Sequence, residues 1–268
     1  MRLCWFDNFR LDVVEGDGVA DVTAALDVLP RAVYPPRLSG DLLVAHLDKV
    51  VPAARSLAGS RKRKPLADVY FRSPVASPTK IIGVPVNYLK HVEEAHEQRD
   101  EFTTRYAGGL EDQGLFLKAN SALTGFGEGM RIRFPHRRND HEMELGMVIG
   151  RPGSHIAEED ALEHVAGYTI ALDFVVRGPE DRSFRKSPDT YAVLGPWLTT
   201  ADEVAEPQAL DLRLRVNGET RQESNTRHMI TSLKPDRVGI AVLHATPRRR
   251  LHDRDLRGRW PGGEGRHS

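Results

Sequence analysis

The sequence has a single cysteine, Cys4, and it has neither a surplus of one charge nor a long apolar run. One thiol cannot build a disulfide framework or a thiolate metal cluster. Lys plus Arg and Asp plus Glu each number 38, so no overall field favours nucleic acid or a membrane as a partner. No segment is long and apolar enough to span a bilayer, and the N-terminus has no signal-peptide hydrophobic region. We therefore expect a cytoplasmic enzyme or binding protein.

The length and the composition are those of a globular protein with one large domain or two smaller ones. The chain has 268 residues, of which 40% are hydrophobic and 28% charged. Residues 1–75 carry short strand patterns and helical stretches, which predict a small β-containing N-terminal domain. From residue 76 onward the chain is rich in strands joined by turns. One example is Leu210–Val216, an alternating strand that leads into the hairpin turn Asn217-Gly218.

Glycine and proline indicate where secondary structure ends or turns in two other segments. Residues Glu158–Ala166 have an apolar stripe at helical spacing, which predicts a helix with Gly167 as its C-terminal stop. Residues Leu194–Leu198 contain Gly-Pro, which predicts a turn leading into a strand.

The most informative stretch is the predicted strand His141–Gly150, which reads His-Glu-Met-Glu-Leu-Gly-Met-Val-Ile-Gly. Side chains two apart share a face of a strand, so Glu142 and Glu144 point one way while the intervening Met and Leu residues point into a core. Like charges held together repel unless a cation or a proton lies between them. A third carboxylate, Asp173, ends the next apolar run. These three carboxylates predict a site for a hard divalent metal.

A second group of candidate residues lies on a helix that we predict to begin at Tyr88, with Asn87 as its N-cap. His91 and Glu94 are three residues apart, so they share one helix face and can hydrogen-bond. A histidine oriented by a carboxylate is the usual arrangement of a general base. The same segment carries further Glu and His residues, so a solvated helix face is the alternative interpretation.

Five local patterns follow one another in a characteristic order. They are Gly83–Glu94, His141–Gly150, Ala166–Asp173, Lys186–Trp197 and Val216–Gln222. Together they resemble the fumarylacetoacetate hydrolase family, which includes acylpyruvate hydrolases, oxaloacetate decarboxylases and hydroxy-diene-dioate isomerases. The resemblance covers about residues 80–232, and the Glu-x-Glu strand with its downstream Asp is the most specific part of it.

The resemblance implies an α+β fold, in which a mixed β-sheet roll over residues 76–232 follows the small N-terminal domain in the sequence. Members of the family usually form homodimers. It implies that Glu142, Glu144 and Asp173 bind Mg2+ or Mn2+. These ions prefer oxygen ligands, and Mg2+ keeps coordination positions for water and substrate.

The resemblance also implies roles for residues around the metal. His91 and Glu94 would be the base and its orienting partner on a lid helix that orders when substrate binds. Lys186, in the Lys-Ser-x-Asp-Thr pattern, would contact substrate oxygens. The other residues that we expect to bind substrate are Lys118, Asp189 and Thr190.

The implied reaction is cleavage of a C–C bond in a 1,3-dicarbonyl such as an acylpyruvate or fumarylacetoacetate, as in aromatic catabolism. A dicarbonyl or 2-oxoacid can chelate the metal through two oxygens, and the metal then stabilises the enolate formed when the bond breaks. In a hydrolase, His91 would deprotonate the attacking water. A decarboxylase releases CO2, and an isomerase moves protons between carbons. All three share the enolate, so a decarboxylase or isomerase of a 2-oxo or 2-hydroxy-diene dicarboxylic acid stays open.

The chain departs from the family after Ser232. The family continues with a helix, a Gly-Asp-containing strand and a Thr-Gly-Thr-Pro-x-Gly-Val-Gly loop. Residues 233–268 instead form an atypical Arg-rich tail that resembles the product of a shifted reading frame. We therefore expect an incomplete catalytic sheet, and an inactive truncated homologue is a further alternative. A natural basic tail that binds nucleic acid is the alternative interpretation of these residues, but we favour the shifted reading frame.

Overall fold

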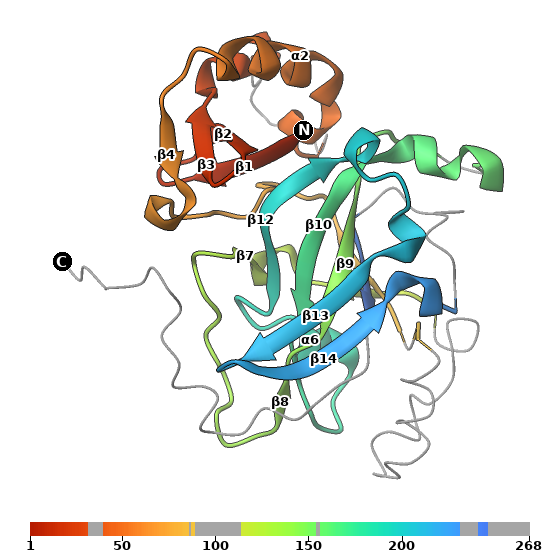
Figure 1. Ribbon diagram of the computed structural model, residues 1–268. Helices are drawn as coiled ribbons and strands as arrows, with labels where there is room; N and C mark the ends of the chain where they lie inside the picture. The colour runs from red at the N-terminus through yellow and green to blue at the C-terminus, as the bar shows by residue number, and fades with distance from the viewer. Residues whose placement is uncertain (32–39, 86, 89–113, 154–155, 231–240, 246–268) are drawn as a thin grey trace.

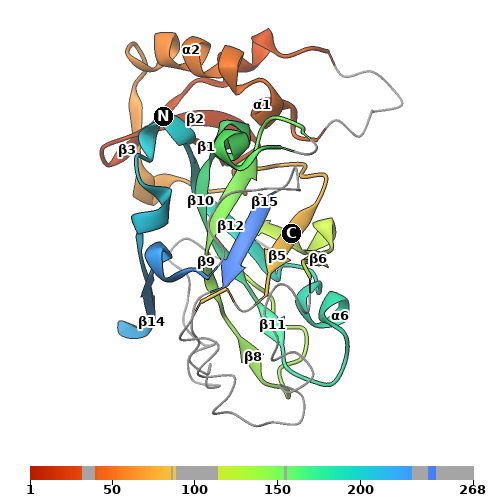
Figure 2. The ribbon, with the colours of Figure 1, turned by 90° about the vertical axis from the view of Figure 1, so that its right-hand side faces the viewer.

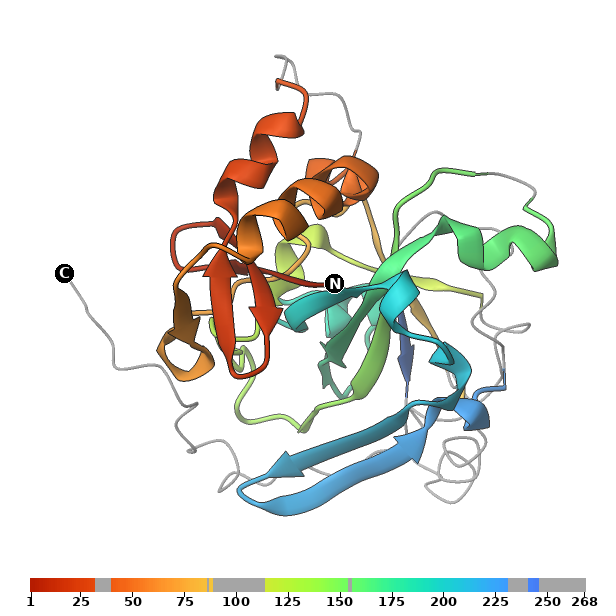
Figure 3. The same cartoon turned by 45° about the horizontal axis from the view of Figure 1, so that its top comes forward.

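The N-terminal part of the chain is an antiparallel ribbon of strands covered by helices. The structure, a computed structural model, describes residues 1–31, 40–85, 87–88, 114–153, 156–230 and 241–245. The first strands are β1 (Arg2–Phe6), β2 (Arg10–Glu15), β3 (Gly18–Asp21) and β4 (Arg63–Pro65). The helices packed on them are η1 (Thr23–Val28), α1 (Leu42–Ala45) and α2 (Leu47–Ala58), as Figure 3 shows. Apolar side chains from strands and helices form one buried cluster there.

The rest of the chain is dominated by strands with short 3-10 turns between them. The longer strands are β9 (Met143–Ile149), β10 (Val165–Asp173), β12 (Ala192–Thr200), β13 (Asp211–Val216) and β14 (Glu219–Asn225). The shorter ones are β5 (Ile81–Val84), β6 (Phe116–Lys118), β7 (Leu123–Gly125), β8 (Asn139–Asp140), β11 (Val175–Val176) and β15 (Ala241–Ala245). One short α-helix, α6 (Arg182–Lys186), begins at the cap Asp181.

Most of the described strands form one large mixed sheet, and β8–β11 and β13–β14 form two separate pairs. Eleven of them join in the order β4-β3-β2-β1-β12-β10-β9-β15-β5-β6, with β7 beside β12. Most neighbours are antiparallel, whereas β15 runs parallel to β5 and β7 runs parallel to β12. The predicted α+β class with a mixed sheet is confirmed (Figure 1). The strands of residues 1–75 continue this sheet, because β1 pairs with β12.

The two faces of β9 separate as its sequence predicts. Met143, Leu145 and Met147 lie in a buried apolar cluster with Tyr88 and other residues. Val148 belongs to a different cluster on the opposite face of the sheet. The glutamates of the alternating pattern share that opposite face, because their positions are even-numbered like Val148.

The predicted hairpin at Asn217-Gly218 is confirmed and lies across the front of β9 and β10 (Figure 1). Both turn residues have positive φ, 52° for Asn217 and 84° for Gly218, which is the type I′ geometry that Asn-Gly favours. The inner leucines of β13 pack in the same cluster as the Met face of β9, so the hairpin forms a second layer over the sheet.

Two predicted element boundaries are wrong. The stretch expected to be a helix up to Ala166 is the 3-10 helix η4 (Glu158–His164), and Gly167 lies inside β10. A Cβ on Gly167 would lie 2.2 Å from the Thr199 carbonyl, so this glycine permits close strand pairing. The Gly195-Pro196 step lies inside β12. Tertiary pairing overrides both local signals, because each segment completes a strand in the middle of the sheet.

The C-terminal expectation also differs from the structure. Residues 241–245, within the tail expected to follow the sheet, form β15 between β9 and β5 (Figure 2). A short apolar run is sufficient for a strand that is paired on both sides. His91 and Glu94 lie outside the described residues. Tyr88, the predicted first residue of the helix that would hold them, instead forms an isolated antiparallel bridge with Met229, so the predicted start of that helix is wrong. Among the described residues, no helix is long and apolar enough to cross a membrane.

Candidate metal centre

The ends of β9 and β10 bring three carboxylates together. Glu142 precedes β9, Glu144 lies within it, and Asp173 ends β10. The Asp173 N–H donates to the Glu142 carbonyl at 2.7 Å, which ties the two strands at this point. Oxygens of the three side chains all lie within 4.8 Å of one another. Glu142 and Glu144 are 0% exposed and Asp173 is 2% exposed, so the three form a buried acidic triad.

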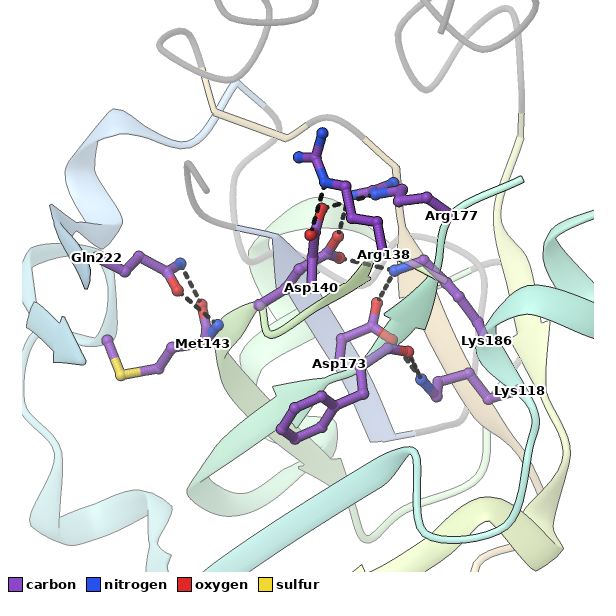
Figure 4. Close-up of polar contacts among 10 residues, drawn as sticks. Lys118, Arg138, Asp140, Met143, Asp173, Arg177, Lys186 and Gln222 are labelled. Carbon is purple, nitrogen blue, oxygen red and sulfur yellow. Dashed lines mark hydrogen bonds and ion pairs between the residues drawn. The ribbon is translucent and has the colours of Figure 1, made fainter. Parts of the chain in front are cut away.

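Two buried lysines face this acidic triad. Lys186, at the end of α6, donates from Nζ to Glu142 Oε2 at 2.7 Å and also to Asp173. Lys118, at the end of β6, donates to the other oxygen of Asp173. It also donates to the carbonyls of Phe174 at 3.2 Å and Tyr191 at 2.9 Å. Figure 4 shows both ammonium groups directed at Asp173 from two sides.

The two lysines have opposite pKa shifts. Burial lowers the pKa of Lys118 from its ordinary value, and the nearby Asp173 carboxylate only partly opposes this effect. Burial also disfavours the charged form of Lys186, but the carboxylates of Asp173 and Glu142 outweigh it and raise its pKa. Lys186 therefore stays an ammonium group at neutral pH.

Two arginines extend the charged network behind the triad. Arg177 donates from Nη2 to Glu142 at 2.9 Å and from Nε to Asp140 at 2.7 Å. Arg138 donates from Nε to the other oxygen of Asp140 at 2.9 Å. Sequence reasoning missed these residues. Asp140 could have been found, because it lies two positions before Glu142 along the chain and is fully buried.

An aromatic ring adjoins the Lys186 ammonium group. The Phe116 ring centroid lies 4.8 Å from Lys186 Nζ and 5.6 Å from the Arg182 guanidinium carbon. Phe116 pairs across the sheet with Gly83. A Cβ on Gly83 would lie 2.0 Å from the ring, so glycine at this position makes room for the aromatic side chain.

The other residues expected to bind substrate lie differently. Asp189 is exposed. Thr190 is partly buried, has a φ of +70°, and accepts a hydrogen bond at Oγ1 from the Arg131 N–H at 2.8 Å. In the described part of the chain neither residue contacts the triad, so their substrate-binding role stays a prediction.

The donor set of the triad fits a hard divalent ion. All three side chains offer carboxylate oxygens, and the single cysteine, Cys4, lies elsewhere, in an apolar cluster with Val14, Val19 and Phe71. His141 is the neighbouring imidazole, and burial lowers its pKa, so it is neutral. A set of oxygen donors on adjacent strands is what Mg2+ or Mn2+ prefers.

The mixed sheet and its buried triad define a protein with an oxygen-ligand site suited to a divalent metal. The chain belongs to the fumarylacetoacetate hydrolase family, because residues 80–235 match the model of the fumarylacetoacetate (FAA) hydrolase C-terminal domain. The family predicted from the sequence patterns is thereby confirmed.

The relatives of this chain are enzymes. It is 48% identical over 237 residues to maleylpyruvate hydrolase of Aquipseudomonas alcaligenes, covering 87% of this chain and 82% of that protein. It is 31% identical over 229 residues to a mitochondrial oxaloacetate tautomerase of Homo sapiens, covering 83% and 68% of the two chains. A crystal structure of maleylpyruvate hydrolase from Sphingobium sp. SYK-6 with manganese(II) and pyruvate is 36% identical. It has a TM-score of 0.74 and covers 92% of this chain and 89% of its own.

Proposed function

We propose that this chain is a Mg2+- or Mn2+-dependent hydrolase that cleaves a C–C bond in an acylpyruvate-type 1,3-dicarbonyl substrate. The observation that carries the proposal is the buried acidic triad with its two lysines. The 48% identity to a maleylpyruvate hydrolase supports this substrate class, as does the similar structure that contains manganese and pyruvate.

In this proposal Glu142, Glu144 and Asp173 hold the metal. When bound, the ion supplies a Lewis acid that stabilises negative charge on a chelated 2-oxoacid. Lys118 has three hydrogen-bond acceptors in the protein, one for each N–H of its ammonium group. These bonds let Lys118 orient Asp173, and the substrate-binding role expected for Lys118 from the sequence stays a prediction.

Lys186 is better placed than Lys118 to act on substrate. It bridges Glu142 and Asp173, and its raised pKa keeps it protonated. A protonated amine donates hydrogen bonds to substrate oxygens and does not act as a base. The base that activates water is then assigned to His91, oriented by Glu94, as the sequence predicts.

The charge of the site favours a doubly charged substrate. Among the described residues, four carboxylates are grouped here, from Asp140, Glu142, Glu144 and Asp173, and four cationic side chains surround them, from Lys118, Lys186, Arg138 and Arg177. The described carboxylates and cationic side chains are equal in number, so a bound divalent ion adds positive charge to an otherwise balanced group. An acylpyruvate with a second carboxylate, such as maleylpyruvate, is a dianion that neutralises this added charge.

The second candidate is a tautomerase, isomerase or decarboxylase acting on a related 2-oxo dicarboxylic acid. The 31% identity to an oxaloacetate tautomerase favours it. The same triad and lysines would serve all of these reactions, because each passes through an enolate. An inactive homologue is the remaining alternative.

The test is an assay of the full chain with Mn2+ against maleylpyruvate, simple acylpyruvates, oxaloacetate and a hydroxy-diene-dioate. We expect pyruvate and maleate from maleylpyruvate, measured by chromatography, and no product with Glu144→Gln. Calorimetry should show Mn2+ binding to the wild type and none to Glu144→Gln. Turnover of oxaloacetate alone would support the second candidate, and Mn2+ binding without any turnover would support the inactive homologue.

We also propose, from the family resemblance, that the chain works as a homodimer in the cytoplasm. Light scattering on the purified chain would test the dimer. A mass of one chain at all concentrations would contradict it.

A further inference from the structure

The side chain of Gln222 makes a two-point contact with the backbone of the strand that carries the glutamates. Its Oε1 accepts a hydrogen bond from the Met143 N–H at 2.8 Å, and its Nε2 donates to the Met143 carbonyl at 3.0 Å (Figure 4). Gln222 is 3% exposed, and 79 residues separate it from Met143. The side-chain amide therefore takes the place of a peptide group from a neighbouring strand.

Met143 lies between two of the candidate metal ligands. Glu142 is held from the β10 side, since its carbonyl accepts from the Asp173 N–H at 2.7 Å. Glu144 is opposite Ala245, the last residue of β15. Gln222 bonds to Met143, the next residue of β9 after the last pair with β15. It therefore continues the hydrogen bonding on the β15 side of β9. The relative orientation of the two carboxylates consequently depends on three separate elements.

The hairpin holds Gln222 in this position. The β13–β14 register shifts between Leu214 and Arg215, which leaves Arg221 as an extra residue beside Gln222. Such bulges redirect side chains and are common beside active sites. Leucines of β13 pack in the same apolar cluster as Met143, so the hairpin approaches β9 through an apolar surface. Gln222 forms the polar contact within this surface.

We propose that Gln222 is a positioning residue of the metal centre, which sets the geometry of Glu142 and Glu144 through the backbone of Met143. The inference rests on the proposed function, because it requires these glutamates to bind the ion. Groups that orient metal ligands typically change metal affinity or activity by about 10–100-fold when they are removed. We expect Gln222→Met, which keeps the length but removes both hydrogen bonds, to weaken Mn2+ binding by this factor.

The experiment measures Mn2+ affinity by electron paramagnetic resonance, which distinguishes free from bound ion and also reports the symmetry of the bound ion. The matched control is Asn225→Leu. Asn225 is a buried amide on the same strand, but it bonds to Asp211 at 2.7 Å and to the Ala209 carbonyl at 3.3 Å, and not to β9. Its loss should lower hairpin stability while leaving the Mn2+ dissociation constant and the line shape unchanged.

The outcomes separate this inference from the proposed function. If the wild type binds no Mn2+, the metal assignment fails and the inference fails with it. If the wild type binds Mn2+ and folded Gln222→Met binds it equally well with the same line shape, only the inference is overturned. Should Gln222→Met not fold, Gln222→Glu provides the second variant, because an ionised carboxylate keeps an acceptor for the Met143 N–H and sets a second acceptor, in place of the donor, against the Met143 carbonyl. Hydrogen exchange at the Met143 amide needs no variant, and rapid exchange in the wild type would also overturn the inference.

Discussion

The acidic triad and Asp12 are buried to a similar degree, but their electrostatic surroundings are opposite. Asp12, in β2, is 1% exposed, and its Oδ1 has no hydrogen-bond partner among the described residues. Burial raises its pKa to about 7, and the nearby Arg10 only partly opposes this effect. Asp173, by contrast, accepts hydrogen bonds from the ammonium groups of two lysines.

The comparison shows that burial alone does not make a carboxylate functional. A buried carboxyl group without a cation becomes a neutral acid near physiological pH. A carboxylate that is paired with ammonium groups can remain an anionic ligand in the protein interior. The positive side chains around the triad therefore keep it available for a metal ion, whereas Arg10 and Lys64 only partly offset the effect of burial on the pKa of Asp12.

The largest effect should follow from Asp173→Asn. This change removes a candidate metal ligand and leaves the Lys118 and Lys186 ammonium groups without their shared carboxylate. Losing one partner of a buried ion pair costs about 3–5 kcal/mol, so the free energy of unfolding should fall by that amount without metal. Denaturant unfolding and Mn2+ calorimetry provide the measurements. The same substitution at Asp12 is the matched control, and tight Mn2+ binding by folded Asp173→Asn would contradict the assignment.

The next effect concerns Lys186→Met, which removes the ammonium group between Glu142 and Asp173. Without metal the free energy of unfolding should fall by about 3 kcal/mol, because two buried carboxylates lose a cation. A divalent ion can replace that charge, so Mn2+ should raise the melting temperature of this variant more than that of the wild type. Differential scanning calorimetry with and without Mn2+ would measure both shifts. In Lys118→Met the rescue should be smaller, because Lys118 also bonds two carbonyls that a metal cannot satisfy.

A smaller effect of opposite sign is expected for Asp12→Asn. The folded pKa of Asp12, about 7, lies above the ordinary value of 3.8, so the folded state binds the proton more strongly than the unfolded state does. The contribution of Asp12 to stability is therefore fully present below about pH 4 and is lost as the pH rises through about 7. A neutral asparagine should raise the free energy of unfolding by about 1–3 kcal/mol at pH 8, and by less at pH 5. Equal effects at both pH values would show that Asp12 is ionised throughout.

The smallest effect is expected at the outer face of the hairpin. Arg213 donates to Glu223 at 2.6 Å, but the two side chains are 53% and 58% exposed. Solvent screens such pairs, so Arg213→Ala should change the free energy of unfolding by at most about 1 kcal/mol and should leave Mn2+ affinity unaltered. Urea unfolding would measure the difference. A larger loss would mean that the hairpin depends on this exposed pair as well as on its apolar inner face.

The sequence by itself determined the features that follow from local periodicity. The alternation along His141–Gly150 placed the glutamates on one face and the Met residues on the other, because strand side chains alternate whatever the neighbouring strands are. Asn217-Gly218 determined a hairpin through its backbone preferences. The family patterns added the mixed sheet and the grouping of Glu142, Glu144 and Asp173, since these residues occupy the ends of adjacent strands.

The family patterns had indicated Lys118 and Lys186 as site residues, but only the tertiary structure decided which carboxylate each lysine contacts. Lys118 reaches Asp173 across 55 residues of chain, and Gln222 reaches Met143 across 79. Neither contact can be predicted from a periodic pattern in the sequence, because each depends on how β6 and the hairpin pack against β9 and β10. The placement of β15 inside the sheet is of the same kind, since a short apolar run becomes a strand only where two neighbours accept its hydrogen bonds. Local sequence patterns therefore determined where the carboxylates of the candidate metal centre lie along their strands. Long-range packing determined how the cationic side chains and the Gln222 amide contact them and their strand.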